Sequence, residues 1–217
     1  MTDFLWTRPT SAAPVSTLLL AHGAGAAMDS NFMDRFCNAA AAQGLEVARF
    51  EFAYMAARRN GGKKAPPPRA DKLVAEYQRA VQDLMAITEG PVLIGGKSMG
   101  GRVAAMLCGS ASCPKRVSGL VCLGYPFHPT GKPDQWRLTP LLESRRPALI
   151  LQGERDPFGS REEIEAITLP DKIGVEWLED GNHDFGPRGR SPATWEGNIE
   201  LAARKTVEFA RQVIDCK

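Results

Sequence analysis

The sequence is poor in histidine, has no long apolar run and carries no marked excess of either charge. Its 217 residues include three histidines, so a reaction that uses an imidazole has only His22, His128 and His183 as candidates. No apolar stretch approaches the roughly 18 residues that a membrane-spanning helix needs. Apolar runs such as residues 91–94 and 148–151 have the length of a strand. We therefore expect no association with a membrane.

The charge balance and the N-terminal residues argue against two further classes. Basic residues number 27 and acidic residues 25, which gives a formal net charge of +2. Dedicated nucleic-acid binders carry a strongly basic patch or stripe instead. The chain begins Met1-Thr2-Asp3 without a basic region, and the apolar residues 18–21 are too few for the core of a signal peptide. We expect a cytoplasmic protein with no nucleic-acid partner.

The cysteine content fits neither a disulfide framework nor a zinc site. The five cysteines make an odd count with no repeated spacing, and most of them have apolar neighbours, as reduced core residues do. Zinc ligands would have to lie closer together. With 43% hydrophobic and 24% charged residues, a chain of this length folds without metals or disulfides. We predict one domain over residues 1–217 and no bound metal.

Short runs rich in valine, isoleucine and leucine alternate with longer segments of helical period. This alternation predicts an α/β fold with a mostly parallel sheet that helices cover on both faces. The expected strands are residues 17–21, 47–52, 92–96, 117–125, 147–153 and 174–178. The expected helices run from Asp29 or Ser30 to Gly44, over residues 73–84 with a cap at Asp71, over 99–108, from a capping box at Ser160 and Glu163, and from Ser191-Pro192 onward.

The segment Gly96-Lys97-Ser98-Met99-Gly100 has the pattern Gly-x-Ser-x-Gly between an expected strand and an expected helix. In that setting the turn is so sharp that the serine takes a strained backbone conformation and its hydroxyl stands clear of the sheet. Side chains at the two glycines would collide with neighbouring backbone. The backbone N–H of Met99, at the start of the helix, then faces the position of an oxyanion. These features predict Ser98 as a nucleophile.

The same residues admit a second interpretation, because Gly96-Lys97-Ser98 resembles the end of a phosphate-binding P-loop. That motif needs a glycine five residues before Gly96, where the sequence has Pro91, and Gly90 is one place out of register. The intervening residues 92–94 are Val-Leu-Ile, which form a strand rather than an open cradle for phosphates. Nucleotide binding is therefore the weaker interpretation.

A serine hydroxyl needs a base to remove its proton, and that base must be a histidine here. Triads built on this serine motif follow the chain order serine, acid, histidine. His183 alone leaves room for an acid at the end of an expected strand, and we predict that Asp156 is this acid. It would orient the imidazole and stabilise its protonated form. Glu154 is the reserve candidate, and Asp184 is less favoured because adjacent side chains in a turn seldom face each other.

The loop His22-Gly23-Ala24-Gly25-Ala26 follows the first clear strand. Its small residues let backbone N–H groups approach a substrate carbonyl, so we predict that Ala24 is the second donor of the oxyanion hole, beside Met99. We expect His22 to fix this loop by hydrogen bonds rather than to act in catalysis. For His128 we favour a role in loop packing over contact with the substrate.

One segment departs from the otherwise mixed composition. Residues 55–70 contain three prolines and no acidic residue, together with five basic residues. The basic positions are Arg58, Arg59, Lys63, Lys64 and Arg69. A solvated, mobile connection is the simpler interpretation. The alternative is a flap over the active site that attracts an anionic substrate.

Four motifs, taken in order, resemble those of one known family. They are His-Gly-Ala-Gly-Ala followed by Met-Asp-Ser, Gly-Gly-Lys-Ser-Met-Gly-Gly-Arg, Tyr-Pro-Phe-His-Pro-Thr-Gly-Lys-Pro, and Gln-Gly-Glu-Arg-Asp-Pro-Phe-Gly. In this combination, from about Val15 to the closing helix, the chain resembles the small α/β-hydrolase-like family that includes testis-expressed proteins and a subunit of a histone acetyltransferase complex. The resemblance implies a minimal α/β-hydrolase fold and a hydrolase with Ser98, Asp156 and His183 as its triad. It implies no particular substrate.

These inferences predict a serine hydrolase of carboxylesterase type that cleaves a small ester or thioester through an acyl-enzyme and needs no cofactor. Its expected partner is a small-molecule acyl substrate, and no motif points to a protein partner. Only a short flap fits between Cys108 and Pro147, so we expect no large cap domain and a small or partly exposed acyl group. The alternative is a non-catalytic binding or scaffold protein that retains the fold, since the family includes a subunit of a complex.

Overall fold

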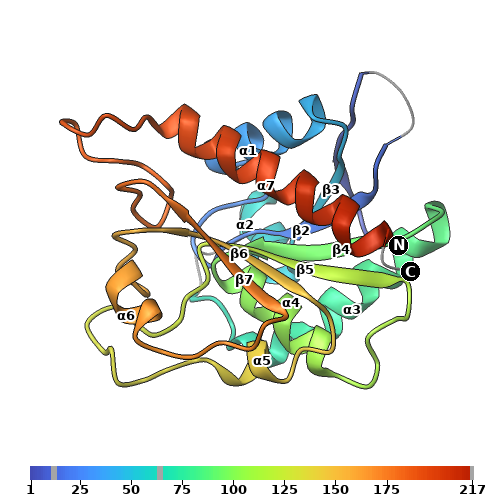
Figure 1. Ribbon diagram of the computed structural model, residues 1–217. Helices are drawn as coiled ribbons and strands as arrows, with labels where there is room; N and C mark the ends of the chain where they lie inside the picture. Colours follow the sequence, from blue (N-terminus) through green and yellow to red (C-terminus); the bar gives the residue numbers. More distant parts are fainter. Residues whose placement is uncertain (11–13, 63–65, 216–217) are drawn as a thin grey trace.

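A seven-stranded sheet forms the centre of the computed structural model, which describes residues 1–10, 14–62 and 66–215. Its strand order is β1-β3-β2-β4-β5-β6-β7 (Figure 1). The strands are β1 (Leu5–Thr7), β2 (Thr17–Ala21), β3 (Glu46–Phe50), β4 (Val92–Lys97), β5 (Val117–Leu123), β6 (Ala148–Gly153) and β7 (Ile173–Leu178). β1 pairs antiparallel with β3, and the other neighbouring strands pair parallel. The mostly parallel sheet predicted from the sequence is confirmed.

Helices cover both faces of this sheet. They are α1 (Asn31–Ala42), α2 (Ala53–Arg59), α3 (Ala70–Ile87), α4 (Met99–Gly109), α5 (Thr139–Leu142), α6 (Arg161–Glu165) and α7 (Trp195–Asp215). Figure 1 shows α1 and α7 side by side on one face, and α3 and α4 on the other. In the described residues, no helix is both long enough and apolar enough to cross a bilayer.

Strand β2 shows how one buried strand serves both faces. Leu19 and Ala21 belong to the core beneath α3 and α4, whereas Leu18 and Leu20 belong to the core beneath α1 and α7. Successive side chains of a strand point to opposite faces, so a strand between two helical layers must be apolar at every position. This explains why the central strands are continuous apolar runs rather than alternating ones.

Tyr77 anchors α3 to the centre of the sheet. Its side chain is completely buried, and its hydroxyl donates to the carbonyl oxygen of Gly95 at 2.5 Å while accepting the N–H of Gly95 at 2.9 Å. A Cβ atom at Gly95 would lie 2.0 Å from the carbonyl oxygen of Val121, so no larger residue fits there. Tyr77 therefore fixes α3 on β4, and the glycine lets β4 lie close to β5.

Two expected helix starts are wrong. The cap of α3 is Arg69, and Asp71 lies inside the first turn without capping it. The closing helix α7 begins at Trp195 rather than at Ser191-Pro192. In its first turn, the backbone N–H of Gly197 donates to Oγ1 of Thr194 at 3.0 Å. The capping box at Ser160 and Glu163 is confirmed at the start of α6.

Candidate active site

Ser98 lies in the turn between β4 and α4, at the C-terminal edge of the parallel strands. Its backbone angles, φ 50° and ψ −113°, lie outside the regions that non-glycine residues favour, so the turn is strained. A Cβ atom at Gly96 or at Gly100 would lie 2.6 Å from the carbonyl oxygen of Ala21, so only glycine fits at either position. The predicted strand-turn-helix arrangement of the Gly-x-Ser-x-Gly motif is confirmed.

His183 lies in the turn after β7, and its Nδ1 atom is 2.7 Å from Oδ2 of Asp156. Asp156 is completely buried in the turn after β6, where its Oδ1 accepts the backbone N–H of Phe158 at 2.9 Å. Gln152, which the sequence did not single out, donates from Nε2 to Oδ2 of Asp156 at 3.0 Å. Because Nδ1 faces the carboxylate, Nε2 is the ring nitrogen that can exchange a proton with another group.

The two other acids considered from the sequence have different partners. Glu154 accepts the backbone N–H of Asp180 at 2.9 Å. Asp184 Oδ1 lies 3.2 Å from Nζ of Lys97, the residue that precedes the nucleophile. Within the described residues, neither carboxylate contacts the ring of His183. The carboxylate beside the imidazole is therefore the one chosen first from the sequence.

Ser98 and His183 approach each other at the end of β5. The N–H of Ser98 donates to the carbonyl oxygen of Leu123 at 2.9 Å. A Cβ atom on the next residue, Gly124, would lie 3.2 Å from Nδ1 of His183, so the imidazole packs on that glycine. In the part of the chain that the structure describes, no hydrogen bond joins the Ser98 hydroxyl to the imidazole. Such bonds are often long before a substrate binds.

Backbone strain is concentrated at these two turns. Among the described non-glycine residues, positive φ occurs at Ser98 (50°), Asp180 (50°) and Phe185 (66°). The last two flank the turn that carries His183. Residues in such conformations cost roughly 1–3 kcal/mol each and persist only where the surrounding structure enforces them.

The loop after β2 lies against Ser98. A Cβ atom on Gly23 would be 3.9 Å from Cβ of Ser98. Ala24 lines the same cavity as Ser98 and Met99, so the two predicted oxyanion-hole residues border one space. Met99 is the first residue of α4, where backbone N–H groups have no partner within the helix. The arrangement offers donors beside the serine hydroxyl.

His22 fixes this loop through both of its ring nitrogens. It is completely buried, with Nδ1 2.6 Å from the carbonyl oxygen of Gly23 and Nε2 3.2 Å from the backbone nitrogen of Phe52. A backbone N–H can only donate, so Nε2 accepts and Nδ1 carries the proton. Burial lowers the pKa of His22, which keeps the ring neutral. The structural role expected for His22 is confirmed.

Tyr54, on α2, holds the same loop from its other side. Its hydroxyl donates to the carbonyl oxygen of Ala24 at 3.1 Å and also lies 3.4 Å from that of Gly23. Both carbonyl oxygens are thus engaged by one side chain, which fixes the orientation of the peptide groups. The sequence did not single out this residue, because Tyr54 lies between the expected strand at residues 47–52 and the basic segment 55–70 and belongs to no clear pattern.

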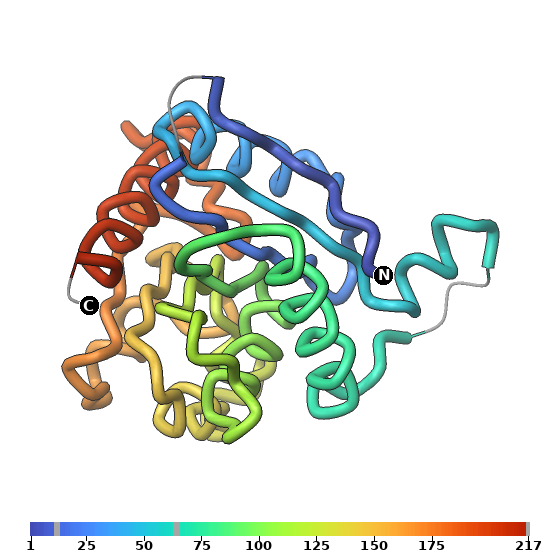
Figure 2. The backbone as a smooth tube through the Cα atoms, turned by 90° about the vertical axis from the view of Figure 1, so that its right-hand side faces the viewer, coloured from blue at the N-terminus to red at the C-terminus, as the bar shows by residue number. Residues whose placement is uncertain are grey.

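The expectation that residues 55–70 form a loop is wrong for their first part, which belongs to α2. Figure 2 shows this region projecting from the body of the molecule. Arg59, at the end of α2, forms ion pairs with Asp29 and with Glu51, each at 2.8 Å. Its charge is therefore neutralised by two carboxylates and ties α2 to the loops after β2 and β3.

The other basic positions of the segment differ in their surroundings. The guanidinium of Arg58 lies 5.2 Å from the centre of the Tyr54 ring, and Lys63 and Lys64 lie outside the described residues. Arg69 lines a cavity beside Ser98 and pairs with Asp71 at 3.2 Å. The segment therefore borders the site at its C-terminal end, where a carboxylate balances the basic side chain.

His128 takes part in loop packing, as expected. It is 2% exposed, and its Nδ1 atom is 3.0 Å from the carbonyl oxygen of Pro129. Its ring lies edge-on to that of Trp136, with centroids 5.6 Å apart, and its Nε2 atom is 3.4 Å from a carboxylate oxygen of Glu163. These contacts join the loop after β5 to the start of α6.

A cavity of about 410 Å³ opens beside Ser98. Its walls come from the loop after β2, the residues around the start of α3, the first turns of α4, and the loops after β5 and β6. Ala24, Ser98 and Met99 lie on one side of it, and Arg102 and Arg137 also line it. The ring of Phe158, another lining residue, is 4.5 Å from that of His183 between centroids.

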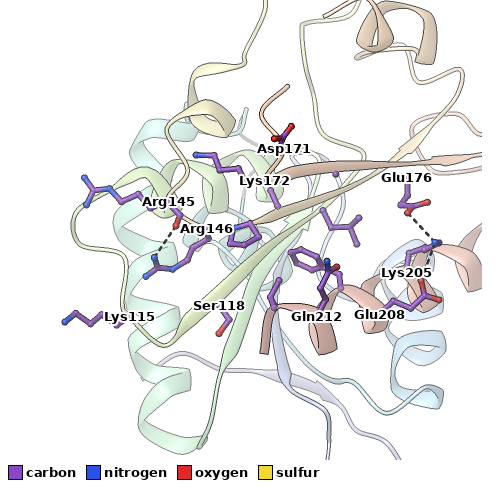
Figure 3. Close-up of a pocket in the computed structure, with 16 residues that line it drawn as sticks. Lys115, Ser118, Arg145, Arg146, Asp171, Lys172, Glu176, Lys205, Glu208 and Gln212 are labelled. Carbon is purple, nitrogen blue, oxygen red and sulfur yellow. Dashed lines mark hydrogen bonds and ion pairs between the residues drawn. The ribbon is translucent and has the colours of Figure 1, made fainter. Parts of the chain in front are cut away.

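A larger cavity, of about 890 Å³, lies at the opposite edge of the sheet (Figure 3). It is bordered by Ser118, Ala148 and Gly174, at or near the starts of β5, β6 and β7, whereas Ser98 and His183 follow strand ends. Three of its basic side chains are engaged elsewhere: Arg146 donates to the carbonyl oxygen of Val117 at 2.5 Å, Lys172 donates to that of Ser144, and Lys205 pairs with Glu176 and Glu208. Size alone does not identify the reactive site here.

Comparisons with known proteins agree with this fold. A family model described as an alpha/beta hydrolase domain matches residues 14–211. An alpha-beta serine hydrolase homologue from Coxiella burnetii is 18% identical with a TM-score of 0.66, over 96% of this chain and 89% of its own. The esterase domain of a Rhodothermus marinus protein is also 18% identical at 0.66, over 97% and 92%.

A third solved structure bears on the missing cap. A Xanthomonas campestris serine hydrolase, described as lacking a lid, is 20% identical with a TM-score of 0.60, over 94% of this chain and 88% of its own. At such identities the likeness shows the fold alone. The predicted fold is confirmed, and no cap domain covers the cavity in the described part of this chain.

Proposed function

The chain belongs to the α/β-hydrolase domain family, and from this membership we propose that it is a serine hydrolase that cleaves a small ester or thioester through an acyl-enzyme. The observation that carries the proposal is the 2.7 Å contact between His183 Nδ1 and the buried carboxylate of Asp156, beside the strained turn of Ser98. A buried carboxylate on an imidazole, next to a partly exposed serine, is the constellation that activates a hydroxyl.

Each residue has one task in the proposed reaction. The Oγ atom of Ser98 attacks the substrate carbonyl while Nε2 of His183 takes its proton. Asp156 holds the ring through Nδ1 and stabilises the imidazolium that forms. The N–H groups of Met99 and Ala24 donate to the oxyanion. His183 then gives its proton to the leaving oxygen or sulfur, and a water molecule, deprotonated by the same imidazole, releases the acid and restores Ser98.

Labelling with a fluorophosphonate tests the nucleophile directly. We expect the wild-type protein to be labelled once, and Ser98→Ala to lose the label because the reagent needs an activated hydroxyl. Ser112→Ala, which removes an exposed serine from the loop after α4, is the matched control and should be labelled like the wild type. A label retained in Ser98→Ala would overturn the assignment.

Kinetics on a chromogenic acetate ester test the other two residues. We expect Ser98→Ala and His183→Ala each to lower kcat by at least about 1000-fold, and the double variant to be no worse than either, since residues that act as a unit are not additive. Asp156→Asn should lower kcat by about 100- to 10,000-fold. No labelling and no turnover in the folded wild type would contradict the hydrolase and favour a binding or scaffold role.

The narrower kinship, to the branch with testis-expressed proteins and an acetyltransferase-complex subunit, is part of this proposal. Both the order of the four motifs in the sequence and their positions in the structure support this kinship. All four motifs contribute to the lining of one cavity, through Ala24, through Ser98 and Arg102, through Pro126, and through Phe158. The fourth motif also contributes Asp156, which lies against His183. The motifs that carry the resemblance thus surround the proposed site.

A further inference from the structure

Two arginines line the cavity beside Ser98 without a carboxylate partner. Among the described residues, Arg102 and Arg137 form no ion pair, and neither guanidinium takes part in a hydrogen bond. Both side chains are half-buried. The buried Arg49 pairs with Asp34, and the partly buried Arg116 and Arg146 donate to backbone carbonyl oxygens. Among the described residues, the guanidinium groups of Arg102 and Arg137 have neither kind of partner.

Arg102 is placed by the nucleophile turn itself. It lies one helical turn after Ser98, and its backbone N–H donates to the carbonyl oxygen of Ser98 at 3.1 Å. Its Nε atom is inaccessible to solvent and has no hydrogen-bond partner in the described residues. A buried donor without a partner costs roughly 1–3 kcal/mol, more when it is charged. A ligand with an anionic oxygen would remove that cost.

Two hydrogen bonds of its backbone fix the position of Arg137 beside this turn. Its N–H donates to the carbonyl oxygen of Phe127 at 2.6 Å, and its carbonyl oxygen accepts the hydroxyl of Tyr125 at 2.8 Å. Burial, together with the positive charge of Arg102, lowers the pKa of Arg137. The two guanidinium groups thus face one space and repel each other when no anion lies between them.

The remaining charges around the cavity do not neutralise this pair. Arg69 and Asp71 also line it, and they form an ion pair with each other at 3.2 Å. Two positive charges are left within one cavity of about 410 Å³. A carboxylate is the anion whose planar shape matches the guanidinium fork, because it accepts two parallel hydrogen bonds.

We propose that Arg102 and Arg137 bind a carboxylate on the substrate, so that the reaction of Ser98 is directed to esters that carry a second, free carboxyl group. This rests on the hydrolase function proposed above. Half-esters of short dicarboxylic acids belong to this class. The cavity brings the two guanidinium groups and the serine to the same small space, which limits the separation between the free carboxylate and the scissile carbonyl to a few bonds.

A pair of matched substrates tests the proposal. The p-nitrophenyl half-ester of glutaric acid and p-nitrophenyl valerate have acyl chains of the same length and differ in the terminal carboxylate. We expect the wild type to prefer the glutarate ester in kcat/KM, and this preference to fall as salt is added. Arg102→Met and Arg137→Met should each lower the ratio of the two kcat/KM values by about 10- to 100-fold, as the loss of a hydrogen bond to a charged group does.

Two further variants make the result specific. Arg102→Lys keeps the charge but not the fork, so it should retain more of the ratio than Arg102→Met. Arg145→Met, which removes an exposed arginine at the opposite edge of the sheet, should leave the ratio unchanged. An unchanged ratio in both methionine variants, or an equal loss on the two esters with fluorophosphonate labelling intact, would overturn the proposal.

A binding measurement separates this proposal from the hydrolase itself. In the Ser98→Ala protein, which cannot turn over, glutarate should raise the melting temperature, and adding Arg102→Met or Arg137→Met should abolish the shift. That result supports the site even if the wild type hydrolyses neither ester, in which case the proposed function alone fails. An identical shift in all the variants contradicts the site. Stronger stabilisation by inorganic phosphate than by glutarate contradicts the assignment to a carboxylate.

Discussion

Gln152 is the residue on which the position of Asp156 depends. Its side chain is completely buried, with Nε2 donating to Asp156 and to the carbonyl oxygen of Gly159, and with Oε1 accepting the N–H of Tyr125. The same Nε2 atom lies 3.3 Å from the carbonyl oxygen of Tyr125. One amide therefore satisfies four polar groups in a space that water does not reach. Buried networks of this kind hold a reactive carboxylate in one orientation.

We expect Gln152→Leu to lower the free energy of unfolding by about 3 kcal/mol, since it leaves buried donors and acceptors unpaired. It should also lower kcat by at least about tenfold, because Asp156 loses a donor that orients it. Chemical denaturation and ester hydrolysis measure the two effects. Gln135→Leu, at an exposed position, is the control. A variant with wild-type stability would contradict the role assigned to Gln152.

Lys97 and Asp184 join the two reactive turns. Lys97 precedes Ser98, Asp184 follows His183, and their charged atoms are 3.2 Å apart. Burial lowers the pKa of Lys97, and the carboxylate of Asp184 opposes that shift. The pair therefore constrains the separation of Ser98 and the imidazole of His183, which is a positioning role in the proposed reaction.

We expect Asp184→Asn to lower kcat by about threefold to tenfold with little change in KM, because it weakens the positioning of two groups and not the binding of substrate. The stability loss should stay near 1 kcal/mol, since the Asp184 carboxylate is mostly exposed to solvent and its attraction is screened. Steady-state kinetics on a neutral ester separates kcat from KM. A rise in KM at constant kcat would show that the pair acts on binding instead.

The elements that the sequence predicts well are those with a clear period. The strand at residues 17–21 and the helix around Tyr77 have unbroken apolar patterns, and Gly44 ends α1 at φ 94° as expected. Element β1 has three residues and exists because it pairs with β3, which no local pattern encodes. α2 is seven residues long and is fastened by the ion pairs of Arg59, which depend on distant carboxylates.

The residues of the candidate site also differ in whether a local sequence pattern marks them. Ser98, Asp156 and His183 could be chosen because each follows a recognisable strand in a turn of distinctive composition. Tyr54 and Arg137 could not, since they reach the cavity and its loops from segments with no periodic pattern. Arg102 stands within a recognisable motif, yet its significance lies in the absence of a partner among the described residues, which only the packing reveals.

His22, in the loop after β2, makes the stability of the protein depend on pH. Burial lowers its pKa in the folded protein, whereas the unfolded chain takes up the proton near pH 6.5. Between these two pKa values the unfolded state binds more protons, so the free energy of unfolding falls as the pH falls. Below the pKa of the folded state this contribution has been lost and no further change follows.

We expect urea denaturation to show this decrease beginning as the pH drops through about 6.5, with a slope of up to about 1.4 kcal/mol per pH unit from this one group. His22→Asn should be less stable at pH 8, because the N–H of Phe52 loses its acceptor, and its stability should fall less steeply between pH 6.5 and the onset of carboxylate protonation. Equal slopes in the two proteins would contradict the assignment.

For the molecule as a whole, the lack of a cap over the described sheet edge limits which substrates bind well. Acyl groups gain affinity by burying apolar surface, and a cavity of about 410 Å³ with no covering domain buries little of a long chain. Among neutral p-nitrophenyl esters we expect kcat/KM to be highest for acetyl and butyryl groups and lower by at least about tenfold for dodecanoyl. A steady rise with chain length would indicate a covered apolar site.

The backbone of Ser98 sets a limit on how stable an active form of this protein can become. At φ 50° and ψ −113° a serine costs roughly 1–3 kcal/mol, whereas glycine adopts such angles freely and loses only about 1 kcal/mol through its more disordered unfolded chain. Ser98→Gly should therefore fold at least as stably as the wild type, and it should neither hydrolyse esters nor be labelled by a fluorophosphonate. A laboratory selection that rewarded heat resistance alone would favour the loss of the nucleophile, so thermostable lineages of this chain must be screened for turnover at every round.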